Sequence, residues 1–154
     1  TALLPVLEAV ARTLEKIYAR DGITVSVAGP DNLAFRGEQH DLEEMLGNLV
    51  DNACKWAKGQ VSLTAKALSE TGSGGLQIQL QIEDDGPGVP AEKREEIFGR
   101  GERADESTPG SGLGLSIVRD IATLYGGDVT LGNASSGGLQ VTLILPGAIS
   151  AKTS

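Results

Sequence analysis

The stretch GSGLGL at residues 110–115 decides how the second half of this 154-residue chain is interpreted. Its three alternating glycines lead directly into residues 113–125, whose apolar side chains recur at helical spacing. A helix that begins after glycines presents free backbone N–H groups and the positive end of its dipole to an anion. The alternative is a hinge or a close helix contact. A P-loop is excluded because no Gly-Lys-Ser/Thr follows, and a Rossmann fingerprint is disfavoured because these glycines follow a loop.

The composition limits how such a chain can bind a phosphate compound. Its formal net charge is −8, so its surface repels DNA and anionic membranes, and we expect no nucleic acid and no direct membrane contact. Aromatic residues make up only 3% against 40% hydrophobic residues, which predicts an aliphatic core. The single cysteine, Cys54, allows no internal disulfide and favours a reducing compartment. A phosphate site must therefore rely on backbone N–H groups, a few placed cations or a metal ion.

The pattern along the chain predicts one α+β domain over residues 1–154. Helices are expected at 3–20, 39–57, 91–96 and 113–125. Strands are expected at 23–27, 33–35, 61–68, 76–83, 129–131 and 139–145. These elements favour a two-layer α/β sandwich, with helices on one face of a mixed sheet and a frayed tail at 148–154. The expected buried stripe of the last helix consists of Gly114, Ile117, Val118, Ile121, Ala122 and Tyr125.

The helix expected at 39–57 carries two stripes. The apolar stripe consists of Leu42, Met45, Leu46, Leu49, Val50 and Ala53. Along its edge run Glu44, Asn48, Asn52 and Lys55, at spacings of four, four and three, which places them on one line of a helix. Asparagine is a poor residue inside helices, and amide oxygens suit Mg²⁺. A solvated helix face is the alternative, and these residues alone favour it.

The stretch DDGPG at 84–88 directly follows an expected strand. Glycines allow the backbone to approach a ligand closely. A carboxylate fixed at a strand end, such as that of Asp84, can accept a hydrogen bond from an exocyclic amine like that of adenine. An ordinary Asp-Gly turn is the alternative.

Taken in order, these segments resemble the GHKL ATPase superfamily, and within it the sensor histidine kinases. Residues 48–53 resemble the N box, 84–88 the first glycine box, 97–101 the F box and 110–115 the second glycine box. The stretch 47–56 is similar to PhoQ-like sensor kinases. The resemblance implies the Bergerat fold, an α/β sandwich that holds ATP between helices and a flexible lid, here residues 98–111.

The resemblance also implies roles for individual residues. Asn48 and Asn52 would serve Mg²⁺ and the phosphates, Lys55 would contact phosphate, and Asp84 would recognise adenine. Trp56 would pack near the adenine, cap the core, or do both. The other nucleotide-binding residues that the resemblance implies are Gly86, Gly88, Phe98, Gly110, Ser111, Gly112, Leu113, Gly114 and Leu115. The catalytic residues that it implies are Asn48, Lys55, Arg100 and Arg103, one of these arginines reaching the γ-phosphate from the lid.

The implied reaction is transfer of the γ-phosphoryl group of ATP to a histidine. Gyrase and Hsp90-like members carry a glutamate as general base where Asn48 stands, and an amide cannot take that proton. The phospho-accepting histidine is expected on a dimerisation hairpin outside this chain, with residues 1–20 as the helix that follows it. His40 is expected to be a surface residue near the start of a helix. Asp85 replaces the asparagine usual there, a change that we expect to be tolerated.

The implied partners are the protein's own dimerisation domain and a downstream response regulator. The implied location is the cytoplasmic side of a membrane-anchored bacterial sensor. Two alternatives stay open: a nucleotide-binding regulatory module without phosphoryl transfer, and a serine kinase of the anti-sigma type. A gyrase or Hsp90-like ATPase is disfavoured by Asn48.

Overall fold

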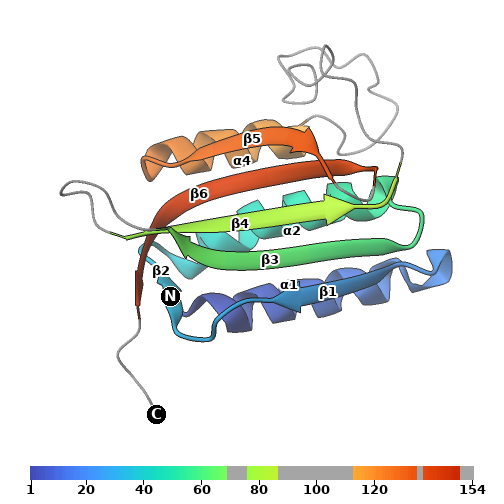
Figure 1. Cartoon of the computed structure of the whole chain (residues 1–154), viewed down its shortest axis with the longest axis horizontal. Helices are drawn as coiled ribbons and strands as arrows, with labels where there is room; N and C mark the ends of the chain where they lie inside the picture. The colour runs from blue at the N-terminus through green and yellow to red at the C-terminus, as the bar shows by residue number, and fades with distance from the viewer. Residues whose placement is uncertain (69–75, 87–112, 135–136, 150–154) are drawn as a thin grey trace.

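The computed structural model describes residues 1–68, 76–86, 113–134 and 137–149. Within these residues, three α-helices cover one face of a six-stranded sheet, as Figure 1 shows. The predicted two-layer α+β sandwich is therefore confirmed. The predicted helix at 91–96 and lid at 98–111 lie outside the described residues. In the described part of the chain, no helix is long and apolar enough to span a membrane.

The three helices follow the predicted segments, with small differences at their ends. They are α1 (Leu3–Ile17), α2 (Gln39–Trp56) and α4 (Leu113–Leu124). A 3₁₀ turn at Ala19–Asp21 replaces the last part of the first predicted helix, and Gly22 closes it in the left-handed region at φ 74°. Helix α4 ends at the glycine pair, as predicted: Gly126 has φ 75° and the Gly127 N–H bonds to the Ala122 carbonyl at 2.8 Å.

The sheet is mixed, because one pair of strands is parallel and the others are antiparallel. Its strands are β1 (Thr24–Ala28), β2 (Leu33–Phe35), β3 (Gln60–Leu68), β4 (Gln77–Asp84), β5 (Asp128–Asn133) and β6 (Leu139–Ile149). The strand order is β1-β3-β4-β6-β2, and β5 also pairs with β6. Strands β1 and β3 form the parallel pair.

Strand β6 is longer than the sequence predicts. The pattern ends the strand at 145 and expects the tail to fray from Ala148. In the structure Ala148 pairs with Ala34, and Ile149 pairs with Leu33 of β2. The frayed tail is therefore wrong for these two residues, because the second half of β6 has its own partner strand. Residues 150–154 lie outside the described part.

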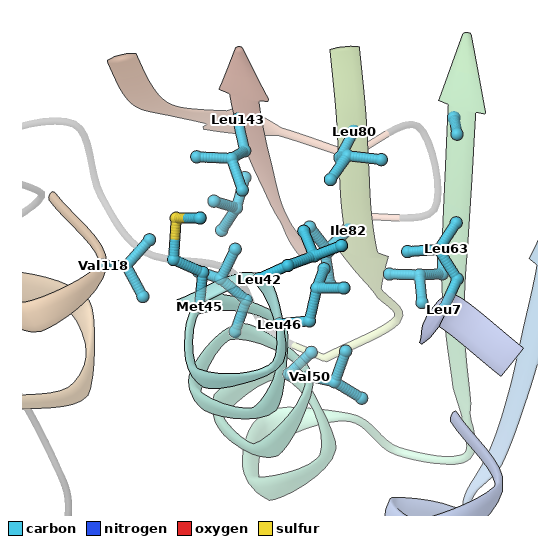
Figure 2. Packing of buried hydrophobic residues seen from close by; sticks show 14 of the residues in the cluster. Leu7, Leu42, Met45, Leu46, Val50, Leu63, Leu80, Ile82, Val118 and Leu143 are labelled. Atoms are coloured by element: carbon cyan, nitrogen blue, oxygen red, sulfur yellow. The ribbon is translucent and has the colours of Figure 1, made fainter. Parts of the chain in front are cut away.

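The core lies between the sheet and the helices. Figure 2 shows α2 under β3, β4 and β6, with Leu7 of α1 on one side and Val118 of α4 on the other. The predicted apolar stripe of α2 is fully confirmed. Among the described residues, the buried side chains are mainly aliphatic, and Phe35 is the one buried aromatic. One expectation for α4 is wrong: Ile117 is 37% exposed, and Leu115 is buried instead.

Candidate functional site

The end of β4, the end of α2 and the beginning of α4 all lie on one side of the molecule, toward the right in Figure 1. The sequence places its three candidate segments at these ends. The DDGPG stretch begins at the last residue of β4, the asparagines lie on α2, and the GSGLGL stretch runs into α4. The fold therefore places the described parts of these segments, which are far apart in the sequence, on one side of the molecule.

Asp84, the last residue of β4, is a buried carboxylate with only 3% exposure. Its Oδ1 accepts hydrogen bonds from the backbone N–H of Gly86 at 2.8 Å and of Leu139 at 3.5 Å. Burial raises the pKa of Asp84, and the neighbouring Asp85 charge adds to this, while the two backbone hydrogen bonds act in the opposite direction. Because a buried carboxyl group costs stability, a shifted one at a strand end indicates a functional site.

The positions of Gly86 and Gly138, close to Asp84, leave no space for a side chain. A Cβ on Gly86 would lie 2.0 Å from the carbonyl oxygen of Trp56. A Cβ on Gly138 would lie 2.2 Å from the main-chain oxygen of Asp84 and 2.3 Å from its Oδ1. The sequence identified Gly86, but it indicated Gly138 only as part of a hairpin loop. The signal for Gly138 was the glycine pair at 137–138, which alone does not show what the turn packs against.

Asp85 has a structural role that the sequence did not reveal. Its Oδ1 accepts hydrogen bonds from the backbone N–H groups of Lys58, Gly59 and Gln60, at 2.7, 3.1 and 3.2 Å. Burial alone would raise the pKa of Asp85, but these hydrogen bonds outweigh it and lower the pKa. Asp85 is thus an ionised carboxylate that binds the turn between α2 and β3.

The polar edge of α2 is graded in burial. Asn52 is 6% exposed, while Asn48 and Lys55 are partly buried and Glu44 is exposed. The Asn48 side-chain nitrogen donates to the Glu44 carbonyl at 2.9 Å, so its amide oxygen is directed away from that carbonyl. A buried asparagine argues against a merely solvated helix face. His40, in the first turn of α2, is 82% exposed, as expected of a surface residue.

A chain of contacts links the end of α1 to this edge. The Tyr18 hydroxyl donates to Asp51 Oδ1 at 2.7 Å, and Asp51 Oδ2 lies 3.7 Å from Lys55 Nζ. Burial and the hydrogen bond to Asp51 both raise the pKa of Tyr18. Lys55 thus pairs with a carboxylate that also accepts a hydrogen bond from Tyr18, the residue that caps α1.

The residues of α2 fit a magnesium ion only when a ligand shares it. Among the described residues, no group of three or more His, Cys, Asp and Glu side chains is arranged to hold a metal. Asn48 and Asn52 lie one helical turn apart and offer neutral oxygen donors. Mg²⁺ commonly takes few protein ligands and completes its shell with water and phosphate oxygens. The donor set therefore suits a metal that arrives with a nucleotide.

The remaining predicted site residues fall into four sets, three within the described residues and one outside them. Trp56 is partly buried against the core, and its carbonyl backs onto Gly86. Leu115 is 1% exposed, so its side chain belongs to the core and only its backbone can face a ligand. Leu113 and Gly114 form the first turn of α4. The residues that lie outside the described part are Gly88, Phe98, Arg100, Arg103, Gly110, Ser111 and Gly112.

Known proteins are similar to this chain in sequence and in fold. A family model described as histidine kinase-, DNA gyrase B- and HSP90-like ATPase matches residues 37–149. The sensor protein PhoQ of Escherichia coli is 38% identical over 140 residues, which are 91% of this chain and 28% of PhoQ. The chain thus spans about a quarter of the length of this relative.

Two solved structures are similar to the whole chain. The ATP-binding domain of PrrB from Mycobacterium tuberculosis is 29% identical with a TM-score of 0.75, and the match covers 96% of both chains. Full-length ShkA in complex with AMPPNP is 30% identical with a TM-score of 0.74, covering 96% of this chain and 30% of ShkA. The chain therefore belongs to the histidine kinase-, DNA gyrase B- and HSP90-like ATPase family, as an ATP-binding catalytic domain of the sensor histidine kinase type.

Proposed function

We propose that this domain binds ATP together with Mg²⁺ and transfers the γ-phosphoryl group to a histidine on a dimerisation domain outside this chain. A response regulator would then receive the phosphoryl group. We place the domain on the cytoplasmic side of a membrane-anchored sensor, where ATP is present. The observation that carries the proposal is that the buried carboxylate Asp84 ends β4 on the side of the fold where α2, with its polar edge, also ends.

Adenine recognition is assigned to Asp84. An ionised carboxylate accepts hydrogen bonds but donates none, so it selects a ligand that presents an N–H group. The 6-amino group of adenine is such a donor. Within a buried site, a hydrogen bond to a charged group contributes about 1.5–3 kcal/mol. Gly86 and Gly138 leave no space for side chains that would push this carboxylate aside.

Phosphate binding is assigned to α2 and to the beginning of α4. Asn48 and Asn52 would hold Mg²⁺ through their amide oxygens, and Lys55 would contact a phosphate oxygen. Bound Mg²⁺ would neutralise charge on the phosphates during transfer. Gly110, Gly112 and Gly114 would let backbone N–H groups approach the phosphates at the positive end of the α4 dipole. The lid, with Phe98, Arg100 and Arg103, would close over the nucleotide.

The residue at position 48 favours transfer over hydrolysis. The side-chain nitrogen of Asn48 donates to the Glu44 carbonyl. Asn48 has an amide where a hydrolytic relative has a carboxylate, so it cannot act as a general base on water. ATP bound here would wait for an outside nucleophile. In-line transfer then depends on positioning and on stabilisation of the developing charge.

Calorimetric titration of ATP with and without Mg²⁺ tests the proposal, with Asp84→Asn beside the wild type. In the variant the amide oxygen would take the Oδ1 position, where Gly86 and Leu139 donate, and the NH2 group would face the adenine amine as a second donor. We therefore expect ATP affinity to fall at least about tenfold. The control is Asp128→Asn, because Asp128 is exposed and its Oδ1 accepts a hydrogen bond from the N–H of its neighbour Val129, outside the proposed site. Equal affinity of wild type and Asp84→Asn would contradict the adenine assignment.

A second experiment separates kinase from regulatory module. The dimerisation domain of the parent protein is added to this domain with labelled ATP, and acid-labile phosphohistidine is measured. Label on that histidine supports the kinase. ATP binding without transfer supports a nucleotide-binding regulatory module, and transfer to a serine of an added partner supports the anti-sigma type.

A further inference from the structure

One carboxylate oxygen hydrogen-bonds the segment after β4 to the turn after α2. Asp85 Oδ1 accepts hydrogen bonds from Lys58, Gly59 and Gln60, which are consecutive backbone donors. Successive N–H groups that point to one place form a concave site for an anion. Asp85 supplies that anion from within the protein, and the ionised form is favoured because the pKa of Asp85 is lowered.

The residue after Asp85 is packed against the end of α2 and bonded to the residue before Asp85. Gly86 lies so close to the Trp56 carbonyl, at the end of α2, that no side chain fits between them. The Gly86 N–H in turn bonds Asp84 Oδ1 at 2.8 Å. Residues 84–86 therefore form a short clip, defined here as the segment that joins the end of β4 to the end of α2.

We propose that Asp85 is a positioning residue for nucleotide recognition: its carboxylate fixes the clip, and thereby sets where the Asp84 carboxylate stands relative to the polar edge of α2. This inference rests on the proposed function, in which Asp84 binds the adenine amine and α2 binds the phosphates. Asp85 itself touches no nucleotide. A nucleotide must span from Asp84 to Asn48, Asn52 and Lys55, so a displaced clip would lose the adenine contact while the phosphate contacts stay.

The test compares ATP with inosine triphosphate, which carries a carbonyl oxygen where adenine carries its amine. Affinities for both are measured by calorimetry with Mg²⁺, and the ratio of the two is the readout. The wild type is expected to bind ATP at least about tenfold more tightly than inosine triphosphate, because one hydrogen bond to a charged group contributes that much affinity. Loss of general folding lowers both affinities together, whereas a displaced Asp84 lowers the ratio.

Three substitutions separate geometry from charge. Asp85→Asn keeps an oxygen acceptor at the same place and should keep the ATP preference. Asp85→Glu keeps the charge but moves it by one methylene group, and should lower the preference by about fivefold or more. Asp85→Ala should lower it similarly. Asp128→Ala, which removes an exposed aspartate elsewhere, should leave the ratio unchanged. Thermal melts confirm that each protein is folded at the titration temperature, and Asp85→Glu replaces Asp85→Ala if the latter is unfolded.

The outcomes distinguish this inference from the proposed function. If the wild type prefers ATP and Asp84→Asn abolishes the preference, the adenine assignment stands. A preference that survives in Asp85→Glu and Asp85→Ala then overturns the positioning role of Asp85. A wild type that binds both nucleotides equally, or not at all, overturns the adenine assignment and the positioning role together.

Discussion

Gly138 lies directly against the carboxylate that we propose recognises adenine, so Gly138→Ala tests that proposal without changing the carboxylate. The added Cβ would lie 2.2 Å from the main-chain oxygen of Asp84 and 2.3 Å from its Oδ1. Real Cβ atoms essentially never come closer than 3.0 Å to such a neighbour. The Asp84 side chain or the turn between β5 and β6 must therefore move.

The expected effects follow from this collision. Overpacking a close contact costs about 1–3 kcal/mol of unfolding free energy. In a domain of this length, each kcal/mol lowers the melting temperature by roughly 2–4 °C. Displacing the acceptor also weakens its hydrogen bond to adenine, so ATP affinity should fall about tenfold. Thermal melts measure the first effect, and calorimetric titration with Mg²⁺ and ATP measures the second.

The neighbouring glycine provides the matched control. Gly137 has φ 102°, but a Cβ there meets nothing within 4 Å. Gly137→Ala therefore adds backbone strain, about 1–3 kcal/mol, without contact to Asp84. Both variants should lose similar stability, and only Gly138→Ala should lose ATP affinity. If Gly138→Ala binds ATP as tightly as the wild type, or if both variants lose affinity equally, the reasoning is refuted.

Three further predictions follow from ionisable groups. Burial raises the pKa of Asp84 above 3.8, so ATP affinity should fall as pH is lowered through the raised value. Between 3.8 and the raised pKa, the native state holds more protons than the unfolded state, so the free energy of unfolding should decrease as pH rises. Asp84→Asn should flatten both the pH profile of ATP affinity and the pH profile of stability. Tyr18→Phe removes the hydrogen bond to Asp51 and should cost about 1 kcal/mol in urea unfolding, because Asp51 is 40% exposed; unchanged stability would contradict this. Burial, followed by the charges of Asp51 and Glu15, raises the pKa of Cys54 to about 12, so a thiol reagent at pH 8 should label it only after unfolding; labelling of the native protein at the unfolded rate would refute it.

The elements were predictable because burial repeats along the chain with the period of each structure. The α2 stripe from Leu42 to Ala53 recurs at helical spacing, and β4 alternates between buried and partly buried residues. The end of β6 was not predictable, because Ala148 and Ile149 are ordered by pairing with β2, more than a hundred residues earlier. The burial of Ile117 was predicted wrongly, because the sequence does not fix which side of α4 faces α2.

The candidate site was predictable only where a local pattern marks it. Asp84 stands at a strand end before glycines, and Asn52 is an asparagine within a helix. Asp85 and Gly138 gave no comparable signal, because their roles depend on partners distant in the chain. The donors to Asp85 are 25 to 27 residues away, and Gly138 packs against Asp84 from another hairpin. Such contacts become visible only when the sheet is assembled.

Asp84 and Asp85 show how adjacent carboxylates in one turn can have opposite properties. Backbone hydrogen bonds lower the pKa of Asp85, so its charge contributes to stability above the unfolded pKa. Burial raises the pKa of Asp84 despite its two backbone hydrogen bonds, and the charge of Asp85 raises it further. The fold thus stabilises the charge that holds the turn and destabilises the charge beside it. A ligand that donates a hydrogen bond to Asp84 reverses that penalty, which is the behaviour expected of a recognition group rather than of a structural one.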